Sequence, residues 1–137
     1  MIEVAQILLF DHRQRLLIYL RDDKQTIPFP NHWDLFGGHL EPGETPEQAL
    51  VREVHEELAY DLRRWQWFRT YLCLEGDAYP NRKFIYWATI DDLAEDLTLC
   101  EGQRLRGIMA HERDGLNFAN ILGCVLEDFI AAGLWPS

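Results

Sequence analysis

One segment near the middle of the chain constrains the fold most, because residues 45–59 carry the signals of an amphipathic helix. Thr45 can cap its N-terminus, Pro46 suits the first helical position and Gln48 completes a capping box. An apolar stripe recurs every four residues, formed by Leu50, Val54 and Leu58. The rest of the chain must therefore offer this helix an apolar surface.

Segments rich in aromatic and β-branched residues lie on both sides of the helix and predict strands. The expected strands are residues 3–10, 15–21, 64–75, 82–90 and 103–109. Residues 22–32 contain two prolines and no periodicity, which is typical of a loop, and residues 117–132 fit a last helix. These elements predict an α/β or α+β fold, an α/β/α sandwich around a mixed β-sheet. We expect one domain spanning residues 1–137.

Three glutamates gather on one side of the predicted helix. Glu53, Glu56 and Glu57 are spaced i, i+3 and i+4, so they share one arc beside the apolar stripe. Like charges at this spacing repel by about 0.2–0.5 kcal/mol per pair, and a divalent cation would relieve that repulsion. Mg²⁺ prefers such oxygen ligands and commonly bridges carboxylates to phosphates. The alternative interpretation is a solvated helix face held by charge pairs.

The spacing of residues before the helix favours the metal interpretation. Five residues separate Gly38 from Glu44, and seven separate Glu44 from Arg52, which begins the run REVHEE. This pattern resembles the Nudix box, G-x5-E-x7-R-E-U-x-E-E-x-G-U, in which U is a bulky apolar residue. The glycine, the arginine and all four glutamates match. The resemblance is close over residues 38–60 and looser over the remaining chain.

Two positions depart from the box. Ala59 stands where the family usually has glycine, and Tyr60 where it usually has a smaller aliphatic residue. Glycine is the usual left-handed stop of a helix, so we expect the helix to end less sharply here. Neither departure removes a metal ligand.

The resemblance implies a MutT-like Nudix hydrolase fold and activity. Such enzymes hydrolyse the pyrophosphate linkage of a nucleoside diphosphate joined to another group, with Mg²⁺ or Mn²⁺ as cofactor. The implied metal ligands are Gly38, through its carbonyl, and Glu53, Glu56 and Glu57. Arg52 and Glu44 are implied as a supporting pair, with a mutual salt bridge expected. Either Glu57 or Glu56 would accept the proton of the attacking water.

An acidic residue outside the box is a further candidate ligand. Glu101 is the first choice because it lies between two strand-like segments, and Asp92, Glu95 and Asp96 are the others. A plain surface role for Glu101 is the alternative interpretation.

The candidate substrate-binding residues lie in and before the box. They are Phe29, Trp33, Gly37, Gly38 and His39. The two glycines permit close approach of phosphate to the backbone. The aromatic residues, together with Tyr79 and Trp87, can stack on a base, although packing in the core or on the sheet is the alternative for each.

Composition excludes several classes. The formal charge of −10 disfavours a nucleic-acid polymer or an anionic membrane as partner. The three cysteines contain no CxxC pair, which disfavours a zinc or dithiol site and is typical of a reducing compartment. Ser137 is the only serine, so a serine nucleophile is excluded. With no signal peptide or membrane-spanning segment in the sequence, we expect a cytoplasmic protein.

Two alternatives remain open. One is a sugar-nucleotide glycosyl hydrolase of the same family, and the other is a Nudix-fold module that binds a nucleotide without catalysis. The retained glutamates favour the pyrophosphate-cleaving enzyme over both. The expected partner is a small nucleotide-derived substrate of unspecified identity. The oligomeric state stays open, with a homodimer as one alternative.

Overall fold

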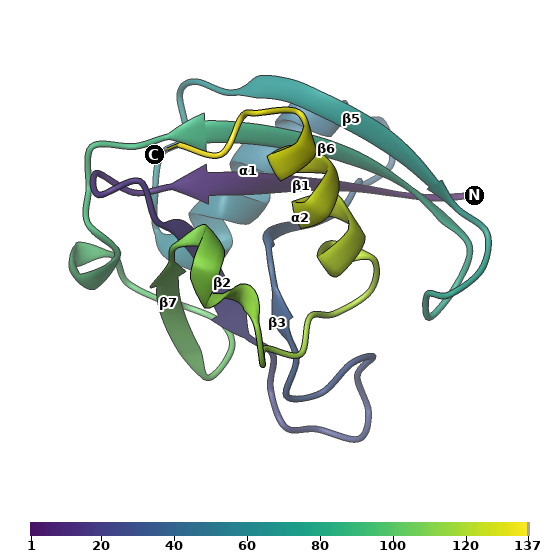
Figure 1. Ribbon diagram of the computed structural model, residues 1–137. Coiled ribbons are helices and arrows are strands. Elements are labelled where there is room, and N and C mark those ends of the chain that lie inside the picture. The colour runs from purple at the N-terminus through teal and green to yellow at the C-terminus, as the bar shows by residue number, and fades with distance from the viewer. Residues whose placement is uncertain (137) are drawn as a thin grey trace.

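The computed structural model describes residues 1–136 and contains a seven-stranded mixed sheet (Figure 1). The strands are β1 (Ile2–Phe10), β2 (Leu16–Leu20), β3 (Trp33–Asp34), β4 (Phe36–His39), β5 (Gln66–Cys73), β6 (Asn81–Thr89) and β7 (Arg104–Ile108). The helices are α1 (Pro46–Leu58) and α2 (Leu122–Ala131), with 3-10 turns at Ala94–Asp96 and Ala110–Arg113. The predicted mixed sheet with helices, an α+β fold, is confirmed.

Strand β1 forms the centre of the sheet. It pairs in parallel with β6 along its whole length, from Ile2 opposite Asn81 to Phe10 opposite Thr89. On its other side it pairs antiparallel with β4, and with β2 at Phe10. Its residues alternate between two apolar clusters, one under α1 and one under α2. The helices thus lie on opposite faces of the sheet (Figure 1).

Helix α1 begins as its sequence predicts. The Thr45 hydroxyl accepts from the Gln48 N–H, and the Gln48 side chain accepts from the Thr45 N–H. Its C-terminus corrects one expectation, because Ala59 adopts the left-handed conformation itself, with φ 52° and ψ 30°. The Ala59 N–H donates to the His55 carbonyl at 2.9 Å. The helix therefore ends as sharply as a glycine would end it.

The structure adds two strands and corrects one further expectation. The glycine-rich stretch before α1, for which the sequence gives no strand signal, supplies β3 and β4, and the Gly37–Gly38 pair lies within β4 against β1. The last helix begins at Leu122, five residues later than predicted. Residues 117–119 instead lie alongside β3 as extended chain. The Trp33 N–H donates to the Asn117 carbonyl, and the Ala119 N–H donates to the Trp33 carbonyl.

No helix formed by residues 1–136 has both the length and the apolar character needed to cross a membrane.

Candidate active site

The end of β4 lies directly against the acidic side of α1. Gly37 N–H donates to Glu57 Oε1 at 2.8 Å. Gly38 faces Glu53 so closely that a Cβ at this position would lie 2.6 Å from the Glu53 carboxyl carbon. Adjacent residues of this strand therefore meet two carboxylates that lie about one helical turn apart.

Gly37 is required by two separate constraints. Its φ of +136° is a conformation that side chains rarely permit, and a Cβ would lie 2.1 Å from the Ala5 carbonyl oxygen. A larger residue would push β4 away from β1, and the N–H that holds Glu57 would move with it.

Arg52 lies at the centre of the carboxylate cluster. Its guanidinium donates to both oxygens of Glu44, at 2.7 and 2.9 Å, which confirms the expected salt bridge. It also donates to Glu53 at 2.9 Å and to the His39 carbonyl at 3.0 Å, and Glu56 lies 3.5 Å away. The Arg52 bonds, with one from the Glu41 N–H, lower the pKa of Glu44 to about 2.

Glu57 is the buried member of the cluster, with 3% of its surface exposed. Burial raises its pKa to about 9, and the nearby charges of Glu53, Glu101 and Asp34 add to that effect against the Gly37 hydrogen bond. Burial likewise raises the pKa of Glu53, despite its bond to Arg52. Glu57 therefore lacks a positive charge that would keep it ionised, and at Glu53 the bond to Arg52 does not offset the effect of burial.

Glu101 is the one outside candidate that acts electrostatically on this cluster. The neighbouring Cys100 N–H donates to the Glu57 carbonyl at 2.8 Å, which holds the loop against the end of α1. The charge of Glu101 raises the pKa of both Glu53 and Glu57.

The other acidic candidates have different surroundings. Glu95 is bound to Arg15 at 2.7 Å. The backbone carbonyl of Asp92 accepts from the His12 N–H at 2.9 Å. Asp96 is exposed at the end of the 3-10 turn Ala94–Asp96.

The candidate base-stacking and phosphate-contacting residues lie partly in the core and partly at the surface. Trp33 is 8% exposed and belongs to the core under α2, and Trp87 packs its ring on Phe129 at 5.7 Å, so the core interpretation is favoured for both. Phe29 is half-buried in the loop before β3, edge-on to His32. His39 is exposed and is hydrogen-bonded to Tyr79.

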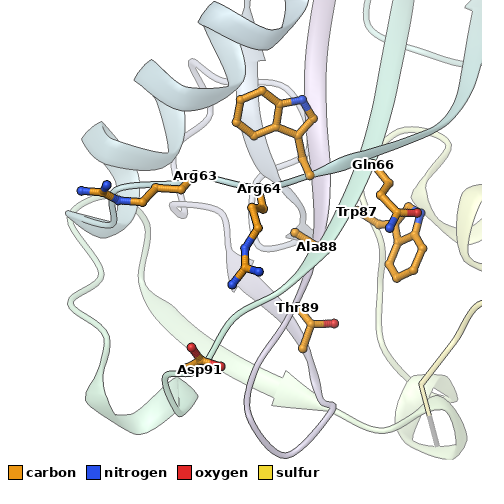
Figure 2. Close-up of a pocket in the computed structure, with 8 residues that line it drawn as sticks. Arg63, Arg64, Gln66, Trp87, Ala88, Thr89 and Asp91 are labelled. Carbon is orange, nitrogen blue, oxygen red and sulfur yellow. The ribbon is translucent and has the colours of Figure 1, made fainter.

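A cavity of about 750 Å³ lies away from this cluster, at the start of β5 and the end of β6 (Figure 2). Its lining includes Arg63, Arg64, Trp87 and Asp91. In Figure 2, Arg64 points towards Asp91, whereas Arg63 extends away. None of the lining residues belongs to the Nudix box, and sequence reasoning did not single out this cavity.

The donor chemistry of the β4–α1 cluster fits a divalent cation. As placed, no three His, Cys, Asp or Glu side chains of residues 1–136 converge tightly enough to hold a metal ion, because Arg52 occupies the space between several of them. The carboxylates nevertheless supply hard oxygen donors. The Glu53 carboxylate fills the space that a side chain at position 38 would otherwise occupy.

A mixed-sheet sandwich holding an acidic helix against a glycine strand defines a fold class shared with known structures. A MutT structure from work on Aliivibrio salmonicida and Vibrio cholerae matches with a TM-score of 0.77 and 23% identity, covering 96% of this chain and 98% of its own. The NUDIX domain of Shewanella oneidensis NrtR, in complex with ADP ribose, matches with a TM-score of 0.78 and 19% identity, covering 95% and 86%.

The family model described as the NUDIX domain matches residues 2–122, and the chain belongs to the Nudix family as a pyrophosphohydrolase that acts on nucleotides. The nucleoside triphosphatase NudI of Enterobacter sp. (strain 638) is 63% identical over 113 residues, which cover 77% of this chain and 79% of that protein.

Proposed function

We propose that the protein hydrolyses a pyrophosphate linkage of nucleoside triphosphates, which belong to the broader class of nucleoside diphosphates joined to another group. Water attacks phosphorus, and Mg²⁺ or Mn²⁺ is the cofactor. One observation carries the proposal: the buried Glu57 is held by the Gly37 N–H beside Glu53 and Glu101, with raised pKa and no neutralising cation of its own. The 63% identical relative, named a nucleoside triphosphatase, supports triphosphates as the first substrates to test.

The metal ligands in this proposal are Glu53, Glu56, Glu57, Glu101 and the Gly38 carbonyl. The cation, when bound, supplies positive charge that neutralises the pyrophosphate oxygens and favours deprotonation of water. The Gly37–His39 main chain and the His39 ring line the side on which phosphate approaches. Phe29 is the remaining candidate for base contact, and Trp33 a weaker one because it is buried.

Arg52 and Glu44 act as positioning residues. Glu44 holds the guanidinium through two hydrogen bonds, and the guanidinium holds Glu53 through one. This arrangement limits the rotamers of the carboxylates before a cation arrives.

One carboxylate must take the proton of the attacking water, and Glu56 and Glu57 are the candidates. Glu56 is half-exposed to solvent, with 48% of its side chain accessible, whereas one oxygen of Glu57 is committed to Gly37. The pH–rate profiles of Glu56→Gln and Glu57→Gln, with Glu53→Gln as a third variant, would assign the base, since only its loss removes the acidic limb.

The test of the function is a substrate screen. Nucleoside triphosphates, ADP-ribose, dinucleoside polyphosphates and nucleotide sugars are incubated with the protein and Mg²⁺ or Mn²⁺, and the products are separated by chromatography. Release of pyrophosphate or phosphate from a triphosphate supports the proposal. A free sugar released from a nucleotide sugar would indicate the glycosyl hydrolase alternative. Turnover of no compound would leave only the binding module.

We further propose that residues 1–137 form one Nudix domain and that two copies assemble as a dimer in the cytoplasm. Trp67, Leu72 and Leu74 support the dimer, because they are about 60% exposed on and after the edge strand β5. Light scattering of the purified protein gives the mass directly, and a monomer at high concentration would reject this assembly.

A further inference from the structure

Tyr79 reaches the candidate active site from outside the Nudix box. It lies in the hairpin loop between β5 and β6, and its hydroxyl shares a hydrogen bond with Nε2 of His39, the last residue of β4. The two rings meet edge to face, with centroids 5.6 Å apart and planes at 89°. A segment distant in sequence therefore contacts the strand end that touches the acidic helix.

The loop that carries Tyr79 is held by buried polar contacts. Lys83 Nζ lies 2.8 Å from Asp77 Oδ2, and these side chains are only 5% and 4% exposed. The Asn81 amide donates to Asp77 and to the Tyr79 carbonyl, both at 2.9 Å. A buried ion pair is seldom more stable than an apolar pair, but its geometry is specific. These contacts hold the main chain of the loop at Tyr79.

The end of β4 connects Tyr79 to the carboxylate cluster of α1 through hydrogen bonds. The His39 carbonyl accepts from Arg52 at 3.0 Å, and Arg52 in turn holds Glu53 at 2.9 Å. One residue earlier, Gly38 faces Glu53. The Gly38–His39 and His39–Leu40 peptide planes meet at the His39 Cα, so a displacement of that atom would shift both the Gly38 carbonyl and the His39 carbonyl.

We propose that Tyr79 is a positioning residue of the candidate active site, which acts through His39 to fix the end of β4 and, with it, the carboxylates that would bind the divalent cation. This inference rests on the proposed metal dependence of the function. It requires no particular substrate, because the chain of contacts ends at the carboxylates and not at a nucleotide.

The test is the affinity of the full-length protein for Mn²⁺, measured without nucleotide from the electron paramagnetic resonance signal of free Mn²⁺. Tyr79→Phe keeps the ring and removes the bond to His39, so the Mn²⁺ Kd should rise about tenfold, as for loss of other outer contacts of a metal site. Tyr71→Phe is the matched control. It loses a hydroxyl bond of 2.7 Å to Asp128, on the face covered by α2, and should leave the Mn²⁺ Kd unchanged.

A double-mutant cycle separates transmission through His39 from a general loosening of the fold. His39→Ala should weaken Mn²⁺ binding as Tyr79→Phe does, and the double variant should be no weaker than His39→Ala alone, because both changes remove the same contact. Urea midpoints of all variants confirm that each is folded. An unchanged Mn²⁺ Kd for Tyr79→Phe, additive effects in the cycle, or absence of Mn²⁺ binding by the unmodified protein would overturn the inference.

This outcome is distinguishable from failure of the proposed function. If the protein binds Mn²⁺ but hydrolyses no nucleotide, the hydrolase proposal fails, while the Mn²⁺ titrations still decide the role of Tyr79. If a nucleotide is hydrolysed, Tyr79→Phe at limiting Mn²⁺ should lower kcat and leave KM for the nucleotide unchanged. A rise in KM alone would assign Tyr79 to substrate contact and overturn the positioning role.

Discussion

Two arginines of this protein each gather several carboxylates, and the clusters differ in charge balance. Arg15 binds Asp11 and Glu95 through close contacts of 2.7 Å to each. Arg52 binds Glu44 in the same way and then shares its remaining donors with Glu53 and, more distantly, Glu56. The first cluster ties the β1–β2 turn to the 3-10 turn Ala94–Asp96. The second lies beside Glu57 and Glu101, neither of which pairs with Arg52.

The pKa values show the consequence of that difference. Burial alone would raise the pKa of Asp11, but hydrogen bonds from Arg15 and Ala94 outweigh it and lower the pKa. The Arg15 bond also lowers the pKa of Glu95 to about 2. In the second cluster, burial raises the pKa of Glu53 and Glu57. A satisfied cluster indicates a structural role, and an acidic cluster short of positive charge indicates a site for a cation.

The largest expected effect comes from removing charge in the second cluster. Glu57→Gln and Glu53→Gln should each lower kcat for nucleotide hydrolysis by about 10²–10⁴-fold, the range associated with loss of a group that handles charge or a proton in the reaction. Glu95→Gln is the matched control in the first cluster and should retain the original kcat. A coupled phosphate assay measures all three, and equal kcat for Glu57→Gln and Glu95→Gln would erase the distinction between the clusters.

Loss of charge in the first cluster, around Arg15, should lower stability and leave catalysis unchanged. Asp11→Asn leaves Arg15 partly unpaired and weakens the acceptor for the Arg13, Arg15 and Ala94 amides. The free energy of unfolding should fall by about 3 kcal/mol, as for a broken buried ion pair, with kcat preserved. Urea unfolding gives the first quantity. A stable but inactive Asp11→Asn protein would show that this cluster also serves the reaction.

The second cluster should also produce a distinctive pH dependence of stability. The pKa of Glu57 rises from the ordinary 4.5 to about 9 in the folded protein, so between those values the folded state binds more protons than the unfolded state. Stability of the metal-free protein should therefore fall as pH rises from about 5 to 9. Glu53 and Asp34 shift in the same direction, so Glu57→Gln should flatten the trend only in part.

Thermal melts of metal-free protein across this pH range measure the effect. Added Mg²⁺ should stabilise the protein most at high pH, because the cation and the Glu57 proton compete. Stability that rises from pH 5 to 9, or an equal slope in Glu57→Gln, would contradict the assignment.

The smallest expected effect concerns the end of the helix that carries the second cluster. Ala59→Gly should increase stability by about 1 kcal/mol, because an alanine in the left-handed region is strained by its Cβ. Ala132→Gly is the control at the end of α2, where the cap has a right-handed φ of −76°. At that position glycine should not increase the stability of the protein. Calorimetry of both variants compares the two caps directly.

Local signals in the sequence were sufficient to predict much of this molecule. Thr45, Pro46 and Gln48 act within one turn, so the start of α1 could be predicted from neighbouring residues alone. The spacing of Gly38, Glu44 and REVHEE likewise pointed to residues that the structure brings together. These predictions succeeded because each depends on short separations along the chain.

Predictions that depend on distant residues were less successful. The glycines of β4 gave no strand signal, because the partner that makes them a strand is β1, more than thirty residues away. The start of α2 was misplaced because residues 117–119 bond to Trp33. The contact of Tyr79 with His39 has no local signal at all.

The central place of β1 has a consequence for synthesis of the chain. Its longest partner, β6, is made some eighty residues later, which takes about 4–16 seconds at ordinary ribosomal rates. During that interval the apolar run IEVAQILLF has emerged but lacks the neighbour that covers one edge. Such a strand invites pairing with other chains, so production at high concentration should benefit from slower expression or a chaperone that binds the nascent N-terminus.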